Sequence, residues 1–411
     1  MSALAINGGT PIRTVPFPKW PIWDEREERA LLDVLHSGLW GVSGREDTQV
    51  RAFENTFAAA HDAHHGVCVT SGSTALKVAL QAIDIDYGDE VIVPPYTFIA
   101  TASTCLHVGA MPVFADIDPA SYLLDPQRVE EAITPRTRAI MPVHIGGCPA
   151  DMDGILSVAK RHGLRVIEDA CQAHFAAYDG RGVGAIGDLG CFSFQSSKNI
   201  TAGEGGIILS NDAELAERCW SISNCGRVRG GEWYQHDVLG DNFRMTEWQG
   251  AILLAQSTRM EEMAQRREDN AHYLGGLLAQ IEGIAPQQPH PKVTRHAYHL
   301  FISRYDPAGF GGAPRSKFLK AVQAEGIPCS GGYVPLYTAH AMQDGIRRLR
   351  RWLEGRDTPY TPPSCPVTDR ACYDEGLWLS QSILLGTHAD MDDIAEAMAK
   401  VQRHTDDLLH N

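Results

Sequence analysis

The sequence lacks an excess of basic residues. Its 411 residues include 36 Lys and Arg against 51 Asp and Glu, which gives a formal net charge of −15 at pH 7. Binding to nucleic-acid phosphates requires a basic surface, so we expect no nucleic-acid partner. A small anionic ligand remains compatible with this charge, because a few local donors suffice to bind it.

The sequence also lacks the features of secreted and membrane proteins. No apolar run approaches the length of a membrane span, and the N-terminus, MSALAINGGTPIR, has no basic segment followed by a long apolar one. The ten cysteines include no C-x-x-C pair and lie mostly within apolar runs, which indicates reduced, packed thiols. We therefore predict a cytoplasmic protein that has no membrane partner and no metal site.

Two nucleotide-binding signatures are missing as well. Val69–Leu76 reads as strand, tight turn and helix start, but it is no G-x-G-x-x-G fingerprint and carries no P-loop lysine. Dinucleotide and nucleoside-triphosphate binding are therefore weak hypotheses. With Gly72 and Ser73, this helix start offers backbone N–H groups and a hydroxyl to a phosphate. A helix cap without a ligand is an equally good interpretation of this segment alone.

Strands and helices alternate through the first part of the chain. Helix-like segments such as Ser73–Ile83, Gln127–Ile133 and Asp153–His162 separate several apolar or β-branched runs. These runs lie at 66–70, 91–94, 111–117, 139–144, 165–169, 189–195 and 205–210. The alternation predicts an α/β fold with a mainly parallel sheet covered on both faces. Such sheets bind ligands at the carboxyl ends of their strands.

The pattern changes after about residue 250. A helix is predicted from Thr246 to about Leu278, and a strand at Tyr298–Tyr305. Further helices are predicted at 24–37, at Ser316–Glu325 and near Met391–Val401, and 339–370 is predicted to be a long loop carrying one helix. We therefore expect a large domain at 1–254 and a smaller α/β domain at 255–411.

Reactive or aromatic residues follow three of the predicted strands. Lys198 lies just past the strand at 189–195, where a Schiff-base nucleophile is placed, although a solvated lysine is commoner. Asp169 ends another strand, and a buried carboxylate there needs a partner such as a protonated pyridine nitrogen; a solvated acid or a helix cap is the alternative. Phe98 suits either the core or stacking on a heterocycle. Together with the phosphate site, these residues are what pyridoxal phosphate requires.

Several longer motifs carry a family resemblance over nearly the whole chain. They are SGSTAL (71–76), VIVPPYTFIAT (91–101), ITPRTRAIMPVHIGG (133–147), VIEDACQAH (166–174), FSFQSSKNITAGEGG (192–206) and NFRMTEWQGAIL (242–253). With these motifs the sequence resembles the DegT/DnrJ/EryC1/StrS family of sugar and cyclitol aminotransferases. The resemblance implies fold type I of the pyridoxal-phosphate enzymes, whose large domain has a mostly parallel seven-stranded sheet flanked by helices.

The resemblance also implies roles for individual residues. Lys198 matches the lysine that binds pyridoxal 5′-phosphate covalently, and Asp169 matches the acid on its pyridine nitrogen. Asn242 resembles an asparagine that reaches the phosphate of the neighbouring subunit, which implies an obligate homodimer with two shared sites. The remaining cofactor contacts are Gly72, Ser73 and Ser193 at the phosphate, Gln172 at the ring oxygen O3′, and Phe98 over the ring.

The residues around the lysine bear on the substrate. Many relatives that act on nucleotide-linked sugars read Phe-Tyr-Pro-Thr-Lys, whereas this chain reads Phe194-Gln-Ser-Ser-Lys198, a form that looks more like members acting on free keto-cyclitols. The implied reaction moves an amino group from glutamine or glutamate to a cyclitol or sugar-like ketone by a ping-pong mechanism. A nucleotide-linked ketosugar substrate, or a dehydratase or aromatising activity, remains the alternative. Lys198 argues against the dehydratases, which have histidine there, and the intact Lys198 and Asp169 argue against a non-catalytic regulator.

A few other polar residues have two interpretations each. For His144 we favour a structural role over a substrate contact, and for Arg227 and Arg229 surface charge over binding of the donor carboxylate. The stretch Tyr333–Tyr337 is a candidate lining of the acceptor pocket.

Overall fold

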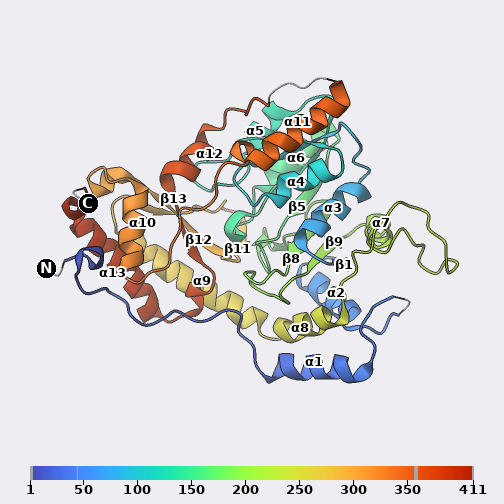
Figure 1. Cartoon of the computed structure of the whole chain (residues 1–411), viewed down its shortest axis with the longest axis horizontal. Coiled ribbons are helices and arrows are strands. Elements are labelled where there is room, and N and C mark those ends of the chain that lie inside the picture. The colour runs from blue at the N-terminus through green and yellow to red at the C-terminus, as the bar shows by residue number, and fades with distance from the viewer. Residues whose placement is uncertain (1–2, 44, 356–359, 410–411) are drawn as a thin grey trace.

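The main element of the fold is a seven-stranded sheet. The computed structural model describes residues 3–43, 45–355 and 360–409 (Figure 1). The strand order is β1 (His65–Val69), β9 (Gly206–Ser210), β8 (Leu189–Ser193), β5 (Arg165–Asp169), β4 (Thr137–Ile140), β2 (Glu90–Val93) and β3 (Met111–Phe114). Only β9 runs antiparallel to its neighbours. The mostly parallel seven-stranded sheet is confirmed, and each of the seven predicted runs supplies one strand.

Helices cover both faces of this sheet. Alternate strand residues enter two separate cores, Ile92 on one face and Val91 and Val93 on the other. The first core is closed by α2 (Gln49–Ala60), α5 (Pro126–Ala132), α6 (Met152–His162) and α8 (Glu247–Ser257), and the second by α3 (Gly72–Ala82), α4 (Ala100–His107), α7 (Ala213–Ser223) and α11 (His340–Glu354). Burial on both faces explains why the strands are almost uninterrupted apolar runs.

A smaller unit lies beside the large sheet. Its antiparallel strands are β10 (Ile284–Pro286), β12 (Leu300–Tyr305) and β13 (Gly376–Ser380), and α9 (Met260–Leu278), α10 (Arg315–Ala324) and α13 (His388–Arg403) complete its core. Both ends of the chain lie against this unit in Figure 1. Leu4 belongs to its core, and the N–H groups of Ala5 and Ile12 donate to Glu325 at 2.8 and 3.0 Å. The first residues of the chain therefore contact the second unit.

The predicted helix from Thr246 to Leu278 is wrong as one element. The helix begins at the predicted place, where the Thr246 N–H donates a capping bond to the Gln249 side chain at 3.0 Å, but α8 ends at Ser257 and α9 begins at Met260. At the break, the buried guanidinium of Arg259 pairs with Glu27 of α1 (Glu25–Ser37). A long-range ion pair thus overrides a locally helical sequence.

The region 339–370 also differs from the prediction. It contains α11 and α12 (Pro366–Arg370), two helices where one was expected, while its residues 356–359 lie outside the described part. The other short elements are β6 (Ala177–Tyr178), β7 (Arg181–Gly182), β11 (Val293–Arg295) and α14 (Thr405–Leu409). None of the helices described is long and apolar enough to cross a membrane.

Candidate active site

The turn between β1 and α3 approaches the end of β8 very closely. The Ser71 hydroxyl caps α3 by accepting the Thr74 N–H at 3.1 Å. A Cβ atom at Gly72 would lie 2.6 Å from the Cβ of Ser193 and 2.9 Å from the sulfur of Cys171. Only glycine therefore fits at position 72, and this close approach joins three strand ends. Ser73 is exposed in the first turn of α3, so a hydroxyl and free helix N–H groups are available to an anion.

Asp169 is buried at the end of β5 with an incomplete set of partners. Its side chain accepts hydrogen bonds from the Thr101 hydroxyl at 2.7 Å and the Cys171 N–H at 3.3 Å. No lysine, arginine or histidine of the described residues forms an ion pair with it. A buried carboxylate needs a compensating charge, and a protonated ring nitrogen supplies one. Sequence reasoning missed Thr101, whose signal is its four-residue spacing from Thr97, a hydroxyl 3.0 Å away.

Lys198 lies in the turn after β8. Burial lowers the pKa of its ammonium group, and the nearby side chains of Cys171 and Asp169 offset this effect only in part. Within the described part of the chain, no carboxylate lies within ion-pair distance of the Lys198 amine. A lysine without a counter-ion and with a lowered pKa is suited to act as a nucleophile and as a base.

Gln172 links two distant segments at the same edge of the sheet. Its side-chain oxygen accepts the Gly146 N–H at 2.8 Å, and its side-chain nitrogen donates to the Tyr333 hydroxyl at 2.9 Å. The first bond fixes which end of the amide is oxygen. One amide hydrogen then has no acceptor among the residues described, and it is available to a ligand oxygen.

The last two predicted contacts, Phe98 and Asn242, are exposed. The Phe98 side chain is 57% exposed in the loop after β2, so it is not a core residue and its ring is accessible for stacking. Asn242 is exposed, and its bridge partner in the chain is Asn224, which was not a predicted site residue. Five predicted residues therefore lie together at the strand ends (Gly72, Asp169, Gln172, Ser193 and Lys198), and Ser73 follows Gly72 in the first turn of α3.

Two other candidates, His144 and Tyr337, are buried and hydrogen-bonded within the protein. His144 is fully buried; its Nε2 bonds Glu168 at 3.0 Å and its Nδ1 accepts the Ala150 N–H at 2.9 Å, which confirms the favoured structural interpretation. Tyr337 is buried and donates its hydroxyl proton to Asp369 at 2.6 Å. Of the Tyr333–Tyr337 stretch, Tyr333 is the residue that reaches the site.

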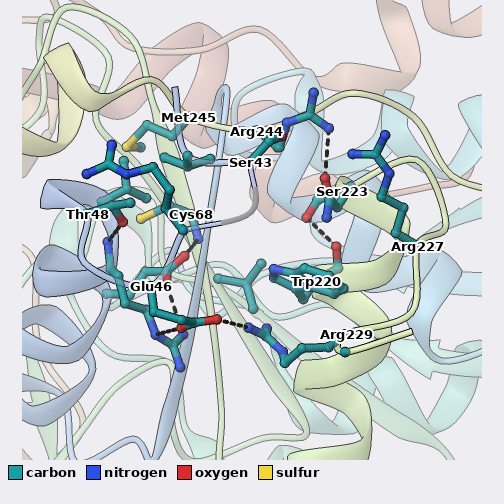
Figure 2. A pocket seen from close by; sticks show the side chains of 18 of the residues that line it. Ser43, Glu46, Thr48, Cys68, Trp220, Ser223, Arg227, Arg229, Arg244 and Met245 are labelled. Carbon is teal, nitrogen blue, oxygen red and sulfur yellow. Dashed lines mark hydrogen bonds and ion pairs between the residues drawn. The ribbon is translucent and has the colours of Figure 1, made fainter. Parts of the chain in front are cut away.

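Arg227 and Arg229 line a separate cavity of about 510 Å³ (Figure 2). Arg229 lies over the Trp220 ring at 4.2 Å and pairs with Glu217 at 3.0 Å. The Arg227 Nε is buried and has no hydrogen-bond partner within the part of the chain that the structure describes. The cavity walls come from α2, β1, α7 and the segments around them, and they include none of the predicted cofactor contacts.

Comparisons with known proteins bear on the family of this chain. The model of the DegT/DnrJ/EryC1/StrS aminotransferase family matches residues 21–399. A protein of Streptoalloteichus tenebrarius named "Putative L-glutamine:3-amino-2,3-dideoxy-scyllo-inosose aminotransferase" is 41% identical over 413 residues, 99% of each chain. The L-glutamine:2-deoxy-scyllo-inosose aminotransferase of the same organism is 39% identical, with 98% of this chain and 99% of the relative covered. The crystal structure of 3-amino-5-hydroxybenzoic acid synthase has a TM-score of 0.85 and 32% identity, with 95% of this chain and 100% of that chain covered.

Proposed function

The chain belongs to the DegT/DnrJ/EryC1/StrS aminotransferase family, and we propose that it moves the amino group of L-glutamine to the ketone of a hydroxylated carbocycle. Family membership makes it a pyridoxal-phosphate-dependent aminotransferase of fold type I. The donor and the acceptor class are proposed because two relatives that match almost the whole chain carry glutamine and a deoxy-scyllo-inosose in their names.

The residues at the strand ends fit the cofactor. We propose that Gly72, Ser73 and Ser193 hold its phosphate, because the first turn of α3 and its hydroxyls meet there. The Asp169 carboxylate, which lacks a charged partner, suits the ring nitrogen, and the free N–H of Gln172 suits the ring oxygen O3′. The exposed ring of Phe98 suits one face of the pyridine.

One observation carries the amine chemistry: Lys198 is a half-buried lysine with a lowered pKa and no carboxylate partner in the described structure. When bound, pyridoxal phosphate supplies an aldehyde for amines and a ring that accepts electrons. We propose that the neutral Lys198 amine removes the proton from Cα of the bound glutamine and returns a proton in the acceptor half of the reaction. Asp169, oriented by Thr101, holds the proton on the ring nitrogen.

The similarity to 3-amino-5-hydroxybenzoic acid synthase favours a second candidate function, the formation of an aromatic amine from an amino-ketone ring. The two relatives named for deoxy-inosose transamination are more similar in sequence, at 41% and 39% against 32%. We therefore place aromatisation second, together with the nucleotide-linked ketosugars.

We also propose a homodimer in which Asn242 reaches the phosphate of the partner's site. Its exposed position and the exposed side chains of Trp233, Tyr234 and Leu239 in the same loop support this assembly. We also propose a cytoplasmic location, because the ten cysteines are free and reduced thiols are typical of that compartment. The division at residue 254, which falls within α8, stays a proposal with two exceptions: the N-terminal segment contacts the small unit, and α11 packs against the large sheet.

A two-stage assay tests the function. In the first stage, holoenzyme receives glutamine alone and should release one keto acid per site, whereas Lys198→Ala should release none. In the second stage, the amino-loaded enzyme receives 2-deoxy-scyllo-inosose, its 3-amino derivative or a nucleotide-linked ketosugar. We expect amination of a carbocycle. Keto acid release followed by amination of the nucleotide-linked ketosugar alone would show that the acceptor class is wrong.

A further inference from the structure

Tyr333 is held rigidly beside Gln172. The segment that carries it is attached to the loop after β2 by the Leu336 N–H, which donates to the Pro95 carbonyl at 3.1 Å. The ring of Tyr333 packs edge-on against Trp378 with a centroid distance of 4.6 Å and against Tyr96 at 5.7 Å. The position of the Tyr333 hydroxyl is therefore fixed by packing before any ligand binds.

The hydrogen bonds determine what the Tyr333 hydroxyl can do. Because the Gly146 N–H orients the Gln172 amide, the amide nitrogen must donate to the tyrosine oxygen. The tyrosine oxygen is then an acceptor in this bond, and its own proton has no acceptor among the described residues. Burial raises the pKa of Tyr333 and Asp169 raises it further, so the hydroxyl stays protonated and remains a donor.

Other buried tyrosines use their protons within the protein. Tyr122 donates to Glu375 at 3.1 Å, Tyr305 to the Ala313 carbonyl at 2.7 Å and Tyr337 to Asp369 at 2.6 Å. Tyr96 accepts from Trp378, as Tyr333 does from Gln172, but Tyr96 has 0% exposure, so its hydroxyl is closed to solvent. Tyr333 is only half-buried, so its proton can point to a bound molecule.

We infer that Tyr333 is a specificity-determining residue that donates a hydrogen bond to a ring hydroxyl of the acceptor. The inference rests on the proposed function, because it takes the acceptor to be a hydroxylated carbocycle. A neutral donor suits a hydroxyl oxygen, whereas a carboxylate or phosphate is bound more strongly by the positively charged groups available elsewhere in the chain. The bond to Gln172 places this contact next to the proposed cofactor oxygen, where the acceptor ketone must react.

The test compares Tyr333→Phe with wild-type holoenzyme on 2-deoxy-scyllo-inosose and on analogues that each lack one further ring hydroxyl. We expect Tyr333→Phe to lower kcat/KM for the full acceptor by about tenfold, the value of one hydrogen bond. Keto acid release from glutamine should fall much less. With the wild type, kcat/KM for one of the analogues should be lower than for the full acceptor by about the same factor. Tyr333→Phe should then give similar kcat/KM values for that analogue and for the full acceptor. The affinity for the amine product, measured by calorimetry, should fall in the same proportion.

Tyr337→Phe is the matched control, because it removes a tyrosine hydroxyl that is already bonded to Asp369. It is expected to keep the wild-type discrimination among the analogues. An equal loss for glutamine and for every acceptor would overturn the inference, because Tyr333 would then act only by holding Gln172. An unchanged kcat/KM would overturn it as well. If the wild type releases keto acid from glutamine yet aminates no carbocycle, both the acceptor class and the inference are wrong.

Discussion

Lys198 carries a charge that its surroundings disfavour, and this has a measurable effect on stability. Burial lowers the pKa of its ammonium group below 10.5, so the unfolded chain binds the proton more tightly than the folded one. The free energy of unfolding of the cofactor-free protein therefore rises with pH between the lowered pKa and 10.5. Below that pH window the buried charge of Lys198 destabilises the folded protein to its full extent, and above the window this destabilisation is absent.

We predict that Lys198→Met stabilises the cofactor-free protein at pH 7. The gain should be about 1.4 kcal/mol for each pKa unit of lowering and should shrink as the pH approaches 10.5. Urea unfolding at several pH values measures it. Lys160→Met, on the exposed side of α6, is the matched control. A gain for Lys198→Met that does not change with pH would contradict the prediction.

At the scale of one strand, β5 carries two adjacent carboxylates with different partners. Asp169 lies at the proposed cofactor site, whereas Glu168 accepts the N–H groups of Gly184, Ile186 and Gly187 at 2.7–2.8 Å and bonds His144 at 3.0 Å. Burial tends to raise the pKa of Glu168, but these donors hold it below 4.5. The resulting stability is present above pH 4.5 and is lost as the pH falls through the lowered pKa.

We expect Glu168→Gln to reduce the free energy of unfolding by about 3 kcal/mol at pH 7, because an amide NH₂ would face backbone donors. The loss should shrink as the pH falls through the lowered pKa of Glu168, because the wild-type carboxylate is then protonated too. Denaturant unfolding at pH 7 and at successively lower pH values measures the difference. Glu131→Gln, on the surface of α5, should cost about 1 kcal/mol or less. Equal losses for the two variants would show that the Glu168 network contributes little.

Helix α9 contains a fully buried arginine whose acceptor is an amide. Arg267 donates twice to the Gln381 side-chain oxygen, at 2.9 and 2.6 Å, and burial lowers its pKa to about 9. Its guanidinium lies 5.4 Å from the Trp20 ring, and Trp20 in turn bonds the Ser196 carbonyl beside the lysine at 2.9 Å. This group of side chains thus connects the small unit to the loop of Lys198.

Removing Gln381 alone should destabilise the protein more than removing both Gln381 and Arg267. Gln381→Leu leaves a buried cation without an acceptor for these bonds and should destabilise the protein by about 3 kcal/mol. Adding Arg267→Met should recover most of that loss, because no unpaired charge remains. Urea unfolding of both single variants and the double variant forms the cycle. Additive losses would mean that the two side chains do not depend on each other.

At the scale of the whole molecule, the proposed dimer makes a prediction about mixed subunits. If Asn242 acts on the partner's site, a dimer of one Lys198→Ala and one Asn242→Ala subunit has one intact site. Random mixing then restores about one quarter of the wild-type activity, since half of the dimers are mixed and each has one of two sites. Each variant alone should be nearly inactive. No recovery after confirmed subunit exchange would place Asn242 in its own subunit's site.

The sequence alone determined the sheet and the local groups at its edge. Apolar runs separated by amphipathic segments must be buried on both faces, so the seven strands follow from burial periodicity. Gly72, Asp169 and Lys198 became candidates because each lies at or just past the end of a strand, and parallel strands bring their carboxyl ends together. The role of Gln172, in contrast, came only from the family resemblance. Their convergence is seen in the structure, and their roles remain proposals.

Only the tertiary structure decided which distant side chains complete these groups. Thr101 bonds Asp169 across 68 positions and Tyr333 bonds Gln172 across 161, and no local pattern encodes such pairs. The pairing of Arg259 with Glu27 divides a helix that the local sequence would continue. The hydrophobic periodicity of the sequence indicates which face of a helix or strand is buried. Which other element packs against that face depends on the tertiary fold of the whole chain.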